Sequence, residues 1–471
     1  MAIPVSTATN TWIAAEVLRD AFIHSLQGEE DLPIEDEAHK SSNEPIFVAK
    51  FLGFLSRNID SLSPSHLTVL SSTLEHFTSY LAATNIHTLA ISFDSDTRKT
   101  FLTNYFAALA LLEAQSGDVP RASPSALFEA ATQGKAGIYA LFGGQGTNEV
   151  YFDELQSLYD IYKPYVQDLI SAISDLVLIP AAEKATDEGF NYYAYGLDVL
   201  SWLQGRTPVP PLDYLASVPI SFPLIGLTQL VQYLVTARVS GLEPSDLRAL
   251  IAGATGHSQG IVSAIAISAS TTLASFTANI SKAVKWLFYS GLRGQDAFPV
   301  VSLDPKIVND AVEGGEGTPT PMLAISGLDR KQLEKHIDAT NKHLPGNSKL
   351  SISLNNGTKN FVITGPAKAL FGLVVALRKI RAPSGADQSK VPFSQRKVVF
   401  SMRFLVVGVP YHSEYLNGAT DKVITDLGGE LWTPDELAVP VYHTEDGKTH
   451  DSVDLFLLAY LLLKSNRFRS S

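Results

Sequence analysis

The sequence predicts an α/β protein with a helical N-terminal region, a parallel-sheet core and an inserted ferredoxin-like subdomain. Residues 1–135 carry helical patterns. Two strand-like segments, at 136–142 and just before Gly256, each run into a glycine-rich turn, as strands of a βα unit do. Residues 321–405 alternate in the order β-α-β-β-α-β, which defines a ferredoxin-like unit.

Composition excludes several classes of site. The chain has 471 residues, of which 45% are hydrophobic and 18% charged, typical of a globular protein. A net charge of −12 disfavours nonspecific electrostatic binding to nucleic acid or to anionic lipid. With no cysteine, disulfides, thiolate metal sites and cysteine nucleophiles are excluded, and we expect no metal.

Location is predicted from the same features. A cysteine-free chain fits a reducing compartment, and the N-terminus lacks the basic and apolar regions of a secretory signal. The longest apolar run near either end, 455–463, is too short to span a bilayer. We therefore expect a cytoplasmic protein without a membrane partner.

The N-terminal region, 1–135, carries no candidate chemistry and is interpreted as a helical support or docking layer. A helix is expected to open at 12–18, and three more are expected near 45–62, 66–82 and 98–114. The acidic stretch 28–43 is expected to be a solvated loop.

The core, 136–320, begins with a buried strand at 136–142 that leads into Gly143-Gly144-Gln145-Gly146-Thr147. This loop lacks the lysine of a phosphate-binding loop and the full G-x-G-x-x-G, so it is not interpreted as a nucleotide site. Residues 149–250 are expected to be mainly helical, and a helix is expected at 274–291.

The subdomain, 321–405, contains four expected strands and two expected helices. The strands are 322–326, 349–354, 360–364 and 398–404, and the helices are 330–343 and 367–381. Asn355-Asn356-Gly357 is the turn signal between the two middle strands.

The candidate nucleophile is Ser258, in Gly256-His257-Ser258-Gln259-Gly260. This G-x-S-x-G lies between an apolar segment and the apolar run 261–267, the strand-to-helix context that holds up a serine hydroxyl. The N-terminus of the following helix would face a developing oxyanion. On these five residues alone, a Gly/Ser-rich turn without chemistry stays open.

The candidate general base is His412, which follows Pro410-Tyr411 just past an expected strand. An imidazole placed there can take the proton of a serine from another strand. With eleven histidines in the chain, a structural role stays open for any one taken alone.

Together these segments resemble the N-terminal acetyl-transferring domain of fungal fatty acid synthase beta subunits, within the acyl-carrier-protein transacylases. The motifs that carry the resemblance are Phe142-Gly143-Gly144-Gln145-Gly146, Gly253-Ala254-Thr255-Gly256-His257-Ser258-Gln259-Gly260, Asn356-Gly357-Thr358-Lys359-Asn360, Ala382-Pro383-Ser384-Gly385-Ala386-Asp387-Gln388-Ser389 and Pro410-Tyr411-His412-Ser413. It implies a transacylase fold with a hydrolase-like parallel-sheet core, to which 406–450 returns carrying His412.

The resemblance implies ping-pong transfer of an acyl group from CoA, through an ester on Ser258, to the phosphopantetheine thiol of an acyl carrier protein. His412 would serve as base, and the oxyanion would lie near the Gln259 N–H and the Gly144-Gln145 loop. His257 would support the turn. Asn356 and Asn360 would orient the acyl or pantetheine group, although holding the β-turn is an equal alternative for both.

Substrate choice follows from one position. Malonyl-using relatives place an arginine about 25 residues after the serine, where it pairs with the free carboxylate. Here the registered residue is Ser290, which suits acetyl or another short neutral acyl group, unless Lys285 or Arg293 supplies a cation. No permanently bound cofactor is expected. The expected partners are acetyl-CoA or a short acyl-CoA, the carrier protein and fatty acid synthase subunits, with no nucleic acid.

The pattern departs from the family beyond Pro440-Val441-Tyr442-His443, and 451–471 is a divergent tail. In transacylases a later segment carries the carbonyl that orients the catalytic histidine, so we expect a truncated catalytic set. Two alternatives stay open. A serine hydrolase would share Ser258 and His412, and an inactive fragment would serve only as a docking piece.

Overall fold

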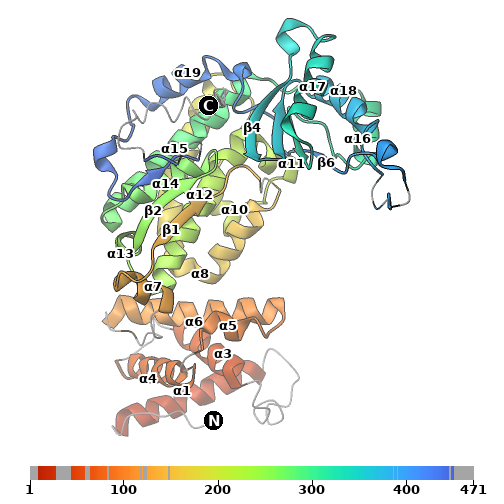
Figure 1. Ribbon diagram of the computed structural model, residues 1–471. Coiled ribbons are helices and arrows are strands. Elements are labelled where there is room, and N and C mark those ends of the chain that lie inside the picture. The colour runs from red at the N-terminus through yellow and green to blue at the C-terminus, as the bar shows by residue number, and fades with distance from the viewer. Residues whose placement is uncertain are drawn as a thin grey trace. The chain divides into compact units, whose positions relative to one another are not determined.

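The computed structural model describes residues 9–27, 44–58, 64–81, 84–116, 119, 125–146, 149–383, 385, 387–389, 391–444 and 447–449. The chain divides into two compact units (Figure 1). The first comprises 1–136, 153–170 and 231–246, and the second comprises 137–152, 171–230 and 247–471. The expected acidic loop 28–43 and the tail 451–471 lie outside the described residues.

The first unit is helical. Its N-terminal helices are α1 (Thr9–Gln27), α3 (Glu44–Arg57), α4 (Pro64–Leu81), α5 (Ile86–Ala90), α6 (Ser95–Ser116) and α7 (Ala126–Thr132). Leucine and phenylalanine side chains from α3, α4 and α6 are fully buried, which is why these amphipathic segments fold together. The four predicted helices are confirmed with shifted ends as α1, α3, α4 and α6, whereas α5 and α7 were not predicted.

Two long helices contribute to both units: α8 (Tyr151–Ile173), and α12 (Val218–Val239). Both helices belong to stretches, Tyr151–Asp187 and Val218–Val239, that are long and apolar enough to cross a membrane. Core helices of globular proteins meet the same criterion, and 89% of the second window is buried inside the protein.

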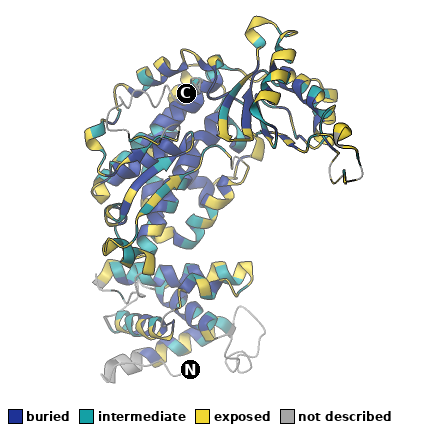
Figure 2. Cartoon of the chain, in the orientation of Figure 1, coloured by how far each residue is buried: buried dark blue, intermediate teal, exposed yellow. Residues whose placement is uncertain are grey.

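The second unit holds a three-stranded parallel sheet, as predicted. Its strands are β1 (Ile138–Phe142), β2 (Ile251–Gly256) and β7 (Val441–Tyr442), in the order β1-β2-β7. The helix α14 (Gly260–Ser268) follows β2 and is buried at every position (Figure 2). The two-residue strand β7 was not predicted. The prediction that the first strand is buried was wrong, because β1 is an edge strand whose Tyr139 and Leu141 are 56% and 74% exposed.

Other helices of this unit connect the strands. They are α9 (Ile179–Asp187), which follows a π-turn at Ser174–Leu178, α10 (Val199–Leu203), α11 (Leu212–Ala216), α16 (Pro305–Glu313) and α19 (Ala419–Leu427). The helix α13 (Pro244–Ala249) is divided between the units after Asp246. Short 3-10 turns occupy Gly346–Ser348, Phe393–Gln395, Glu414–Leu416 and Pro434–Glu436.

The helix α15 (Leu273–Ala297) extends beyond its predicted end at Gly291. A Cβ on Gly291 would lie 3.0 Å from the Val218 carbonyl oxygen, and one on Gly294 would lie 2.8 Å from the Tyr411 hydroxyl. These glycines therefore permit close packing instead of ending the helix. The prediction of the end was wrong because tertiary contacts outweigh the local preference.

The ferredoxin-like subdomain has the predicted order. It consists of β3 (Met322–Ser326), α17 (Arg330–Asn341), β4 (Ser351–Gly357), β5 (Asn360–Thr364), α18 (Ala367–Arg378) and β6 (Ser401–Phe404). The sheet is antiparallel with the order β4-β5-β3-β6, so β4 and β6 are its edges. Alternate strand residues form one core with the apolar side chains of α17 and α18.

Candidate active site

Ser258 occupies a sharp turn between β2 and α14. A Cβ on Gly256 would lie 2.0 Å from the carbonyl carbon of Gly260, so a side chain there would collide with the backbone. Glycine at both positions lets the chain reverse within four residues. Ser258 itself adopts a φ of 52°, in the left-handed region that side chains rarely occupy.

His412 lies against this serine. Its Nε2 is 3.0 Å from Ser258 Oγ, although the two residues are 154 positions apart. His412 is 5% exposed and adopts a φ of 59°. Within the described ranges, Ser258 and His412 are the only non-glycine residues with positive φ. Backbone strain of this kind clusters at functional sites, and here both strained residues meet.

The glycine-rich loop after β1 abuts the same turn. A Cβ on Gly144 would lie 2.9 Å from the His257 carbonyl oxygen and 3.1 Å from Ser258 Cβ. Gln145 Nε2 donates to the Ser221 hydroxyl of α12 at 3.2 Å. The structure therefore brings the predicted oxyanion loop next to the predicted nucleophile.

Sequence reasoning missed a supporting residue, Gln229. Its Nε2 donates to the Gly143 carbonyl oxygen at 2.8 Å, and its Oε1 accepts from Ser263 Oγ at 2.9 Å. This amide joins α12 and α14 to the loop after β1. The available signal was an amide in a mainly apolar helix, close to the buried residues Leu227 and Leu230.

The two predicted asparagines have different surroundings. Asn356 Oδ1 lies 3.2 Å from His257 Nε2, so β4 reaches the residue beside the nucleophile. Asn360 Oδ1 accepts from Ser326 Oγ at 2.5 Å, which holds β5 to β3 inside the subdomain. Asn356 therefore lies beside the nucleophile turn, whereas the hydrogen bond of Asn360 is to β3 and not to the β-turn that was its alternative. The roles expected of both residues remain predictions.

Ser290 in α15 and Gln259 at the start of α14 have buried polar side chains. Ser290 is fully buried in α15, and its carbonyl oxygen accepts from the Tyr411 hydroxyl at 3.3 Å. Burial raises the pKa of that Tyr411 phenol well above its ordinary value. Among the described residues, neither Ser290 Oγ nor the Gln259 amide has a hydrogen-bond partner, an arrangement that usually marks a site for a ligand or an ordered water.

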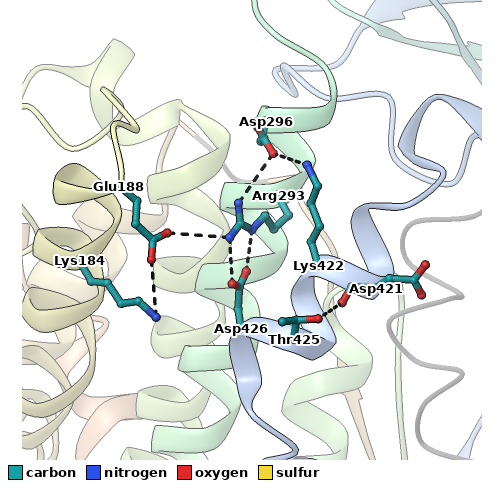
Figure 3. Close-up of polar contacts among 8 residues, drawn as sticks. All are labelled: Lys184, Glu188, Arg293, Asp296, Asp421, Lys422, Thr425 and Asp426. Carbon is teal, nitrogen blue, oxygen red and sulfur yellow. Dashed lines mark hydrogen bonds and ion pairs between the residues drawn. The ribbon is translucent and has the colours of Figure 1, made fainter.

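Arg293, one turn beyond Ser290, is held within the chain (Figure 3). Its Nε and Nη2 donate to both oxygens of Asp426 in α19, at 2.6 and 2.9 Å. Asp296 and Glu188 add carboxylates at 3.8 and 4.0 Å, and the Asp426 hydrogen bonds raise the pKa of Arg293 further. Lys285 likewise pairs with Glu430 at 2.8 Å. Both cations that flank Ser290 are thus neutralised by the chain's own carboxylates.

The site unites a serine hydroxyl, an imidazole and the N-terminus of a helix. This combination can deprotonate the serine, form an ester and stabilise an oxyanion. Where residues are described, no three His, Asp or Glu side chains gather closely enough to hold a metal ion.

Two family comparisons agree with this geometry. Residues 140–398 match the family of the starter unit:ACP transacylase in aflatoxin biosynthesis, and residues 1–112 match the N-terminal domain in fatty acid synthase subunit beta. The first match covers more than half of the chain and includes Ser258.

Individual relatives extend the comparison. The chain is 40% identical to the fatty acid synthase subunit beta of Saccharomyces cerevisiae, over 88% of this chain and 21% of that one. It is 39% identical to the same subunit of Schizosaccharomyces pombe, over 92% of this chain and 20% of that one. The chain thus spans about a fifth of the length of these relatives. A malonyl CoA-acyl carrier protein transacylase structure from Clostridium perfringens aligns with a TM-score of 0.44 at 17% identity, over 70% of this chain and 79% of that one. On the family match, the chain belongs to the starter unit:ACP transacylases.

Proposed function

We propose that the chain transfers an acetyl or other short neutral acyl group from CoA to the phosphopantetheine thiol of an acyl carrier protein. The observation that carries this proposal is the 3.0 Å contact between Ser258 Oγ and His412 Nε2. The family match supports transfer to a carrier protein, and the beta-subunit relatives support a place in fatty acid or polyketide synthesis. The proposal includes a cytoplasmic location and no permanently bound cofactor.

In the first half-reaction, His412 Nε2 takes the Ser258 proton as Oγ attacks the thioester carbonyl. The tetrahedral oxyanion lies near the Gln259 N–H, at the start of α14, and the Gly144 loop. Collapse breaks the carbon–sulfur bond, and the departing CoA thiolate takes the proton from His412. An acyl ester remains on Ser258.

In the second half-reaction, His412 takes the proton of the pantetheine thiol, and the sulfur attacks the ester carbonyl. Collapse breaks the carbon–oxygen bond, and the proton passes to Ser258 Oγ. The enzyme returns to its starting form, and the acyl group leaves as a thioester.

The neutral acyl preference rests on Arg293 and Lys285. Each already has a carboxylate partner, so neither is available to pair with a malonyl carboxylate without losing that partner. Ser290, the uncharged residue between them, is buried beside Tyr411. An anionic acyl group would therefore be desolvated without a compensating charge.

Mass spectrometry of the intact chain tests the proposal. After exposure to acetyl-, hexanoyl- or malonyl-CoA, the acetyl adduct is expected to form fastest and to be absent from Ser258→Ala. His412→Gln is expected to slow adduct formation by about 10²- to 10⁴-fold. His336→Gln, in α17, is the control histidine. Equal adducts on wild type and Ser258→Ala would contradict the proposal, and release mainly to water with pantetheine present would indicate a hydrolase.

A further inference from the structure

The turn that carries His412 holds this residue in a conformation that side chains rarely adopt. Its φ of 59° lies in the left-handed region, so the surrounding structure must keep the backbone there. A hydrogen bond within the turn itself joins the Tyr411 N–H to the Val409 carbonyl oxygen at 2.9 Å. Such a bond shapes the turn, but it does not fix the position of the turn relative to Ser258.

Tyr411, the residue before His412, connects this turn to two helices. It is 2% exposed, and its ring stacks on Phe222 of α12 with the ring centroids 4.9 Å apart. Its hydroxyl donates to the Ser290 carbonyl oxygen of α15 at 3.3 Å. A Cβ on Gly294 would lie 2.8 Å from that hydroxyl, so the glycine leaves the space that the phenol occupies. The side chain is therefore held at both its ring and its hydroxyl.

The helix α12 also holds the opposite side of the site. Ser221, next to Phe222, accepts a hydrogen bond from Gln145 Nε2 at 3.2 Å, and Gln145 lies in the glycine-rich loop after β1. Gln229 of the same helix bonds to that loop as well. One helix therefore contacts both the predicted oxyanion loop and, through Tyr411, the turn that carries the base.

We propose that Tyr411 is a positioning residue, which holds the His412 imidazole at bonding distance from Ser258 by anchoring the turn to α12 and α15. The inference rests on the proposed function, because His412 acts there as the base. Burial raises the pKa of the Tyr411 phenol well above its ordinary value, so the hydroxyl keeps its proton near neutral pH and remains a donor. Tyr411 takes no chemical step of its own and acts through His412.

Removal of the hydroxyl alone isolates this role. Tyr411→Phe keeps the ring on Phe222 but loses the bond to α15, so the turn gains freedom to move away from Ser258. A misplacement of about 1 Å can cost about 10²-fold in rate, so a shift of half that distance predicts acylation about 10-fold slower. KM for acetyl-CoA should stay within about twofold of wild type, because alignment of the base acts on the transition state. Both half-reactions should slow alike, since the same imidazole moves the proton in each.

Tyr151→Phe is the matched control. Tyr151, in α8, is 1% exposed, and its hydroxyl donates to the Leu215 carbonyl oxygen at 2.9 Å. Both substitutions thus remove a buried phenol hydroxyl from a backbone carbonyl, and thermal unfolding should show similar losses of stability in the two proteins. Only Tyr411→Phe should slow the acylation of Ser258, whereas Tyr151→Phe is expected to stay within about twofold of wild type.

A double variant shows whether Tyr411 acts through the imidazole. In His412→Gln the base is already missing, so the addition of Tyr411→Phe should lower the rate by less than about twofold more. A second substrate, p-nitrophenyl acetate, acylates a reactive serine without a CoA moiety. Tyr411→Phe should slow the release of p-nitrophenol by about the same 10-fold factor as acylation from acetyl-CoA.

Four outcomes would overturn the positioning role. The first two are unchanged acylation in Tyr411→Phe and equal slowing in Tyr151→Phe. The third is a further loss in the double variant as large as that in Tyr411→Phe alone, which would assign Tyr411 to the acyl pocket or the oxyanion loop. The fourth is a loss with acetyl-CoA that p-nitrophenyl acetate does not share, which would indicate a contact with CoA.

Failure of the proposed function would look different. Wild type would then form no Ser258 ester from acetyl-CoA, or would not pass it to pantetheine. The comparison with p-nitrophenyl acetate would still test the role of Tyr411 in that case, because it depends only on the serine and the imidazole.

Discussion

The contact between the Gly144 loop and the nucleophile turn can be tested by adding a single methyl group. Gly144→Ala places a Cβ 2.9 Å from the His257 carbonyl oxygen. Ordinary van der Waals contact for such an atom begins at 3.4 Å. The Cβ would also lie 2.9 Å from His257 Nδ1, but rotation of that side chain would leave the overlap with the backbone oxygen. The loop and the turn must therefore separate by about 0.5 Å.

This separation has a predictable cost. A misplacement of about 1 Å near reacting atoms can cost about 10²-fold in rate, so half that distance predicts a loss of about tenfold. Tenfold corresponds to about 1.4 kcal/mol in the activation barrier. Overpacking of this kind also lowers the free energy of unfolding by about 1–3 kcal/mol. The protein should remain folded while Ser258 becomes harder to acylate.

The assay is the rate of acetyl-adduct formation on Ser258, measured by rapid quench and mass spectrometry, beside thermal unfolding. Gly146→Ala is the matched control, since a Cβ there meets no atom within 4 Å. Neither glycine has the positive φ that would strain an alanine, so the two variants differ in contact alone. We expect Gly146→Ala to acylate within about twofold of wild type.

A normal rate in Gly144→Ala would contradict this prediction, because it would mean that the loop does not restrain the turn. A loss in Gly146→Ala as large as that in Gly144→Ala would also refute it. In that case the flexibility of the loop would matter, and its distance from His257 would not.

Three further predictions concern stability. Asp426→Asn should lower the free energy of unfolding, measured in urea, by about 2 kcal/mol, because Arg293 loses a charged hydrogen-bond acceptor. An unchanged free energy would mean that Asp296 and Glu188 take the place of Asp426 as partners of Arg293. Leu370→Ala, in the subdomain core, should lower the free energy of unfolding by about 2–5 kcal/mol. Val375→Ala, at a more exposed position of the same helix, should lower it by less than about 0.5 kcal/mol, and equal losses in the two variants would contradict this packing. Burial lowers the pKa of His87 below its ordinary value of 6.5. As pH falls through 6.5, the unfolded state therefore binds a proton before the folded state does, and the free energy of unfolding should decrease. His87→Gln should weaken this pH dependence, and an unchanged dependence would contradict the prediction.

Several features of the site were predictable because local rules determine them. The spacing of Gly256 and Gly260 around Ser258 predicts a strand–turn–helix, and the structure has it between β2 and α14. The β-α-β-β-α-β order follows from periodicity and turn signals, and these govern short-range structure. The roles of Ser258 and His412 in catalysis remain predictions.

Other features depend on contacts between distant segments. The strand β7 has two residues and exists because Val441 and Tyr442 pair with β2, far away in sequence. Gln229 supports the loop after β1 from a helix whose sequence indicates only a core position. The approach of Asn356 to His257 likewise requires the subdomain to be in place. Periodicity within one segment contains no information about such pairings.

The division of α8 and α12 between the two units has a consequence for dissecting the protein. The stretch 153–170 belongs to the same unit as the N-terminal helices. In that unit, the Tyr162 ring packs against Phe106, and its hydroxyl oxygen forms a 2.8 Å hydrogen bond with His87 Nε2. A shortened polypeptide starting at residue 137 would retain Tyr162 but lose both neighbours. The aromatic surface exposed in this way would favour aggregation. A fragment that starts at residue 137 would therefore need polar residues in place of the exposed aromatic ones.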